Sequence, residues 1–135
     1  MSLLLDTGAL YAYYDRSDHW HAKMVALIRK EARGLIVPAP VIPEVDYLLG
    51  ARLGAASRSV FYSGIIGNHF FVADLPRAAY FRVAQIDAQF ADLELGFVDA
   101  SIVALSESLK ARRVATTDRR HFTPLASAFS LELLP

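Results

Sequence analysis

The sequence has no cysteine, no long apolar run and no excess of charge of either sign. Without cysteine, neither disulfide bonds nor thiolate metal sites can hold the chain together. This composition fits a reducing cytosol, so we expect a cytoplasmic protein. No apolar run is long enough to span a bilayer, and the first residues, MSLLLDTGAL, lack the basic start of a signal peptide. We therefore expect no membrane association.

The charges balance, with 14 acidic and 14 basic side chains and a formal net charge of zero. Most proteins that bind nucleic acid carry a basic excess, so the overall charge argues against general coating of nucleic acid. A neutral chain can still bind a phosphate backbone if it segregates its charges locally.

What the sequence does have is ample material for a core, since 54% of its 135 residues are hydrophobic. Short apolar runs predict strands at 2–5, 35–37, 70–73 and 114–116, and a fifth at 129–133. Helical spacing predicts helices over 8–14, 18–34 with Asp18 as N-cap, 40–52, 54–67, 76–90 and 98–110. This alternation predicts one α/β domain over residues 1–135, a three-layer α/β/α sandwich around a mostly parallel sheet.

Four carboxylates fall at the ends of these expected elements. Asp6 and Asp118 each follow a strand, whereas Glu44 and Asp99 lie near the start of a helix. In a parallel α/β sheet the strand ends and helix starts share one edge, so the four acids are predicted to converge. Taken singly, each also fits an ordinary role as a cap, turn or solvated residue. Asp6 and Asp99 fit that role least, because their neighbours are apolar.

Converging carboxylates repel one another, and a divalent cation is the usual compensation. Oxygen ligands without cysteine favour Mg²⁺, or Mn²⁺, over zinc. Such an ion can polarise a phosphodiester and activate water. The pattern therefore indicates metal-dependent phosphodiester hydrolysis.

Four segments, LLLDTGALYA, VIPEVDYLL, DLELGFVDASIVALSE and VATTDRRHF, occur in this order between residues 3 and 122. Together they resemble the PIN domain family, and especially the VapC-type toxin ribonucleases of type II toxin–antitoxin systems. The resemblance implies a PIN-like fold and an endoribonuclease that depends on Mg²⁺ or Mn²⁺. It also implies an RNA substrate, a cognate antitoxin protein and a homodimer.

The resemblance also assigns roles to individual residues. It implies that Asp6 and Asp99 are the principal metal ligands, assisted by Glu44 and Asp118, and that all four acids are catalytic. Thr116 matches a small hydroxyl residue of the fourth segment and would orient Asp118 or a water. Asp92 is interpreted as a loop or capping residue.

Basic and aromatic residues lie close to these acids in the sequence. A cationic rim that holds phosphates is one interpretation of the basic residues, and a solvated surface is the other. The aromatic residues can stack on unpaired bases or pack the first helices, and packing is favoured for Trp20. The apolar stretch 60–66 is either core or a dimer or antitoxin surface. The residues concerned are Arg16, His19, His21, Arg119, Arg120 and His121 for the rim, and Tyr11, Tyr13, Tyr14 and Trp20 for stacking.

Other families fit less well. A haloacid-dehalogenase-type phosphatase needs a second acid two residues after the first, and Gly8 stands there. A receiver domain needs adjacent acids at its first strand and a late lysine, but Leu5 precedes Asp6 and arginines follow Asp118. A PIN-like binding module without catalysis, a PIN nuclease in RNA processing and a nuclease acting on DNA remain as alternatives. Retention of all four acids argues against the silent module.

Overall fold

The structure, a computed structural model that describes residues 1–135, contains five strands in one sheet. The order across the sheet is β3-β2-β1-β4-β5, and every neighbouring pair is parallel. The predicted sheet is therefore confirmed, and it is parallel throughout. The strands are β1 (Leu3–Leu5), β2 (Leu35–Pro38), β3 (Phe71–Ala73), β4 (Arg113–Ala115) and β5 (Glu132–Leu134).

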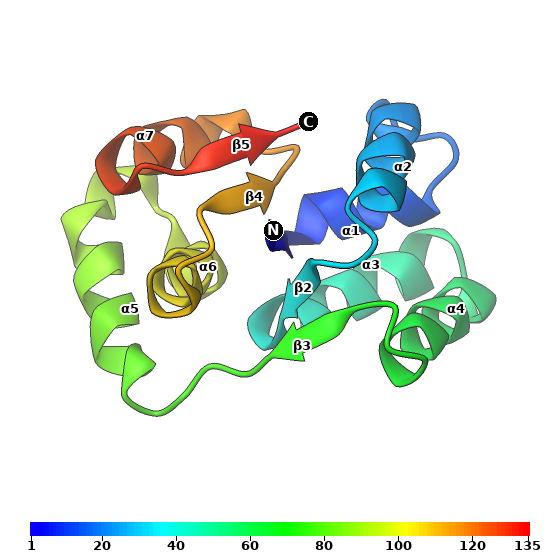
Figure 1. Cartoon of the computed structure of the whole chain (residues 1–135), viewed down its shortest axis with the longest axis horizontal. Helices are drawn as coiled ribbons and strands as arrows, with labels where there is room; N and C mark the ends of the chain where they lie inside the picture. The colour runs from blue at the N-terminus through cyan, green and yellow to red at the C-terminus, as the bar shows by residue number, and fades with distance from the viewer.

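Helices cover the sheet in two groups, as Figure 1 shows: α1 to α4 lie on one side of the strands and α5 to α7 on the other. This is the predicted three-layer arrangement. No helix is both long and apolar enough to cross a membrane. The helices are α1 (Thr7–Tyr14), α2 (His21–Lys30), α3 (Ile42–Arg52), α4 (Ala55–Ile66), α5 (Ala79–Gln89), α6 (Gly96–Leu109) and α7 (Arg119–Phe129), with short 3₁₀ turns η1 (Ala39–Val41) and η2 (Ala91–Leu93).

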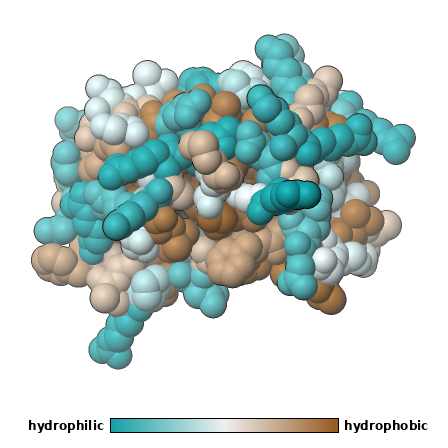
Figure 2. Space-filling model, in the orientation of Figure 1, coloured by the Kyte–Doolittle hydropathy of each residue, from teal (hydrophilic) through white to brown (hydrophobic).

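The core forms where the most apolar elements meet. The three leucines of β1 are fully buried, as expected for a central strand of a parallel sheet. Helix α6 buries every residue from Ala100 to Ser106 and packs against α5, α7 and β2. The edge strand β3 leaves Phe71 exposed, and hydrophobic side chains gather in the lower middle of the face seen in Figure 2.

The strand order reverses between β1 and β4. The chain builds β1, β2 and β3 outward to one edge and later returns to place β4 on the other side of β1. Leu5 pairs with Ala115 in this register, so Asp6 and Thr116 follow from neighbouring strand ends. In open α/β sheets, ligands bind in the crevice at such a switch point.

Three expectations about the elements were wrong. Helix α7 was not predicted, because it contains Pro124, which cannot donate the intrahelical hydrogen bond. The last strand is Glu132–Leu134 and not 129–133, since α7 extends to Phe129. Asp18 does not cap α2: its carboxylate accepts a hydrogen bond of 2.8 Å from the Trp20 N–H in the preceding turn, and the helix runs from His21 to Lys30.

Candidate active site

All four predicted acids border one cavity of about 460 Å³. Its wall combines the start of α1, the first turns of α3 and α6, and the start of α7. The sequence-predicted convergence of the acids is thus present in the structure. The lining residues are Asp6, Thr7, Gly8, Glu44, Leu95, Gly96, Phe97, Val98, Asp99, Asp118 and His121.

Asp6 is the most deeply buried acid of the site, with only 5% of its surface exposed. It is the N-cap of α1, and its Oδ1 atom accepts a hydrogen bond of 2.7 Å from the Ala9 N–H. Burial raises the pKa of Asp6 to about 7, although hydrogen bonds from Thr116 and Ala9 lower it; nearby Asp99 and Asp118 raise it further. The structure therefore holds a carboxylate where its charge lacks compensation.

Asp99 stands in the first turn of α6, on the opposite wall. Burial raises the pKa of Asp99 to about 6; the contact with His121 lowers this pKa, and the acids Asp118 and Glu44 raise it. An anion in the first turn of a helix is favoured by the helix dipole. Burial is the largest of the effects on the pKa of Asp99.

Asp118 and His121 are fixed together at the start of α7. Asp118 is the N-cap, and its Oδ1 atom accepts a hydrogen bond of 3.1 Å from the His121 N–H. The Asp118 N–H in turn donates to Oγ1 of the buried Thr116, at 2.9 Å. Thr116 thus contacts Asp118 through the backbone.

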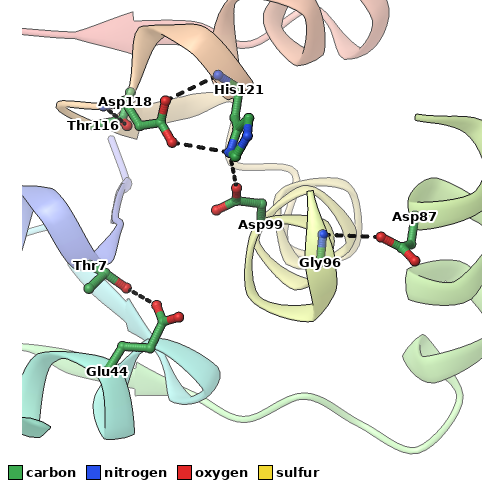
Figure 3. Close-up of polar contacts among 8 residues, drawn as sticks. All are labelled: Thr7, Glu44, Asp87, Gly96, Asp99, Thr116, Asp118 and His121. Carbon is green, nitrogen blue, oxygen red and sulfur yellow. Dashed lines mark hydrogen bonds and ion pairs between the residues drawn. The ribbon is translucent and has the colours of Figure 1, made fainter. Parts of the chain in front are cut away.

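The His121 ring lies between two acids, as Figure 3 shows. Its Nδ1 atom is 3.0 Å from Oδ2 of Asp99 and 3.2 Å from Oδ2 of Asp118. Glu44 lies across the site from this group, where its Oε1 atom accepts a hydrogen bond of 2.5 Å from the Thr7 hydroxyl. The acids therefore form two walls with the cavity between them.

Two glycines shape the cavity wall, a role that the sequence analysis assigned to neither of them. A Cβ atom on Gly8 would lie 2.3 Å from Oγ1 of Thr117. Gly96 has a φ of +80°, a conformation that favours glycine. Its N–H donates to Oδ1 of Asp87 at 3.1 Å, which ties the start of α6 to α5 (Figure 3).

The structure does not support the cationic rim, one of the two interpretations of the basic residues. Of its six members, only His121 lines the wall. Arg16 and His21 border a separate cavity between α1, α2 and α4, and the His21 Nδ1 atom lies 2.7 Å from the Ala12 carbonyl oxygen. Arg119 donates to the Pro135 carbonyl at 2.7 Å and lies over the Trp20 ring. His21 and Arg119 are therefore engaged by local contacts, with α1 and with Trp20 and the chain end.

The aromatic residues singled out in the sequence serve packing. Tyr11 is buried, and the rings of Tyr13 and Tyr14 meet edge to face within the aromatic packing of α1. The aromatic side chain at the cavity is instead Phe97, which stacks on Tyr80 with 5.9 Å between ring centroids. Asp92 lies exposed in η2, outside the cavity, in agreement with its interpretation as a loop residue.

The donor set of the cavity fits a divalent cation. Asp99, Asp118 and His121 offer ligand atoms that all lie within 4.8 Å of one another, and Asp6 and Glu44 add further carboxylates to the lining of the same cavity. Carboxylate oxygens are the ligands that Mg²⁺ and Mn²⁺ prefer. A bound cation would supply the positive charge that the buried acids lack.

The sequence model of the PIN domain family matches residues 3–126. Ribonuclease VapC26 of Mycobacterium tuberculosis is 32% identical over 123 residues, which cover 91% of each chain.

Two solved structures share the arrangement of strands and helices. VapC20 of Mycobacterium tuberculosis, described as a sarcin–ricin loop cleaving toxin, superposes with a TM-score of 0.86 at 19% identity, over 99% of this chain and 100% of that one. DNA-bound VapBC from Salmonella typhimurium superposes with a TM-score of 0.71 at 16% identity, over 98% and 96% of the two chains. At these identities the two structures show a common fold.

Proposed function

Because the chain belongs to the PIN domain family, we propose that it is a metal-dependent endoribonuclease, the toxin of a VapBC-type toxin–antitoxin pair. The observation that carries this proposal is the convergence of Asp6, Glu44, Asp99 and Asp118 on one cavity at the switch point of the sheet. VapC26, a relative of this chain in sequence, is a ribonuclease. RNA phosphodiester bonds are therefore the proposed substrate.

In this proposal Asp6 and Asp99 are the principal metal ligands, assisted by Glu44 and Asp118. A Mg²⁺ or Mn²⁺ ion there supplies Lewis acidity toward the phosphodiester and a means of activating water. Thr116 supports the site because its hydroxyl accepts a hydrogen bond from the Asp118 backbone N–H. The Thr7 hydroxyl fixes one oxygen of Glu44 and so orients its carboxylate toward the cavity.

The proposed protein partners are a cognate antitoxin and a second copy of this chain. Helices α3 and α4 carry large apolar side chains in contact with solvent: Tyr47, Val60, Tyr62 and Ile66. The same stretch buries Phe61 completely, so it contributes to the core and also leaves apolar side chains exposed to solvent. These exposed side chains support the proposal that a protein partner covers this part of the chain.

RNA cleavage by the purified protein tests the proposed function. We expect the wild-type protein to cut RNA in Mg²⁺ or Mn²⁺, and Asp6→Asn to lose this activity. Asp92→Asn is the matched control, because Asp92 is an exposed acid outside the cavity. Thermal unfolding of each variant shows that it folds.

A wild-type protein that binds RNA without cutting it would instead support a silent PIN-like module. Cleavage of DNA in preference to RNA would contradict the assigned substrate. Equal activity of Asp6→Asn and the wild type would contradict the assigned site.

A further inference from the structure

His121 carries the only side-chain nitrogen atoms on the wall of the acidic cavity. Its Nδ1 atom faces Oδ2 of Asp99 at 3.0 Å and Oδ2 of Asp118 at 3.2 Å. The chain has three other histidines, His19, His21 and His69, and none of them lines this cavity. Any nitrogen ligand that this chain supplies to an ion in the cavity must therefore come from His121 or from the backbone.

The separations around His121 match those between ligands of one ion. Neighbouring ligands of an octahedral ion lie about 3 Å apart when each ligand is about 2.1 Å from the metal. The distances from Nδ1 to the two carboxylates have this size. In the metal-free protein the Nδ1 atom forms a hydrogen bond with Asp99, and binding of an ion through Nδ1 would release that proton.

The start of α7 holds the histidine in this position. Asp118 caps the helix by accepting from the backbone N–H of His121, so one turn of chain fixes both side chains relative to each other. Asp99 approaches from the start of α6. Two elements therefore present one nitrogen and two carboxylates to the same point (Figure 3).

We propose that His121 is a nitrogen ligand of the metal ion, together with Asp99 and Asp118, and that it makes this site favour Mn²⁺ over Mg²⁺. The inference rests on the proposed function, which requires a divalent ion at the same carboxylates. Mg²⁺ strongly prefers oxygen ligands and retains its water, whereas imidazole suits first-row transition ions. A histidine in the ligand set thus shifts selectivity without changing the acids.

Pulsed electron paramagnetic resonance of Mn²⁺ bound to the whole protein tests this assignment directly. A directly bound histidine gives a nitrogen coupling to Mn²⁺, which changes when the histidines carry ¹⁵N. We expect this coupling in the wild type and in His19→Gln, the matched control at an exposed histidine. We expect His121→Gln to lose the coupling.

Titration calorimetry with Mn²⁺ and with Mg²⁺ measures the selectivity. His121→Gln is expected to weaken Mn²⁺ binding on the order of tenfold and to weaken Mg²⁺ binding less, because glutamine offers an oxygen. Mn²⁺ that binds the wild type without coupling to histidine nitrogen would overturn the inference and leave the proposed function standing. The ¹⁵N comparison on the wild type decides this even if His121→Gln fails to fold.

Asp99→Asn separates the two proposals. Loss of Mn²⁺ binding in Asp99→Asn places the ion at the acidic cavity, as both proposals require. Unchanged binding of Mn²⁺ by this variant would overturn the proposed site and the histidine ligand together.

Discussion

A Cβ atom on Gly8 would lie 2.3 Å from the Oγ1 atom of Thr117. Gly8 stands two residues after Asp6, and Thr117 directly precedes Asp118. The first turn of α1 and the turn between β4 and α7 therefore meet so closely that a Cβ atom on Gly8 would force the Thr117 side chain or the backbone to move. This close approach helps to hold Asp6 and Asp118 on the same cavity.

The substitution Gly8→Ala is expected to lower RNA cleavage by about tenfold or more, because displacement of catalytic groups by an ångström is costly. Alanine in a helix is intrinsically more favourable than glycine by up to about 1 kcal/mol, so helix propensity alone would give no loss. Initial rates on one RNA substrate measure the effect.

The double variant Gly8→Ala/Thr117→Ala provides the control. It removes the Oγ1 atom, after which the nearest atom of residue 117 is its Cβ, 3.6 Å from the new methyl group. Activity should then return toward that of Thr117→Ala alone. A double variant as impaired as Gly8→Ala would contradict the steric explanation.

The stability of the metal-free protein should fall as pH rises from about 4 to about 7. The pKa of Asp6 is about 7 and that of Asp99 about 6 in the folded chain, against an ordinary value of 3.8. Between these values the folded state binds more protons than the unfolded state, so raising the pH favours unfolding. For Asp6 the loss has an upper limit of roughly 4 kcal/mol, since a tenfold change in proton affinity is about 1.4 kcal/mol. Urea denaturation in chelator across this range measures the trend.

Asp6→Asn separates this contribution from the other titrations. Asparagine retains an oxygen to cap α1 but carries no charge, so this variant should lose less stability over the same pH range. Saturating Mg²⁺ or Mn²⁺ should also flatten the wild-type trend, because a bound cation favours the ionised acids. The same slope in the wild type and in Asp6→Asn would show that burial of Asp6 does not cause it.

The contact between Asp87 and Gly96 predicts a positioning effect on Asp99. Asp87→Ala removes the acceptor for the Gly96 N–H and should lower kcat several-fold, with little change in overall stability, because a single exposed hydrogen bond contributes only about 1 kcal/mol. Asp87→Asn keeps an acceptor oxygen and should retain most of the activity. Steady-state kinetics of both variants test this, and equal activity of Asp87→Ala and Asp87→Asn would contradict it.

The convergence of the acids was predictable because it depends on a simple rule. Asp6 and Asp118 directly follow apolar strands, and parallel strands end at the same edge of a sheet. The order of the strands was not predictable from local patterns, although it is the order that places β4 beside β1. Glu44 and Asp99 could be placed at the same edge in a similar way, because each lies near the start of a helix.

The contacts of His121 with the acids could not be predicted from the sequence pattern. Its position depends on α7, and Pro124 within that helix conceals the helical pattern. The contact of His121 with Asp99 joins two helices that are separated in the chain. The sequence could not decide between a cationic rim and a solvated surface for a similar reason, because Arg119 contacts Trp20 and the chain end through contacts that no local spacing reveals.

Dependence of RNA cleavage on divalent ions is the most direct test of the central claim, that an ion held by the four acids carries the activity. The protein is stripped with EDTA, and Mg²⁺ or Mn²⁺ is then returned to the wild type and to Asp99→Asn. We expect that stripping abolishes cleavage, that either ion restores cleavage in the wild type, and that Asp99→Asn stays inactive at the same ion concentration. Cleavage that persists in EDTA, or that Asp99→Asn performs at the wild-type rate, would contradict the account.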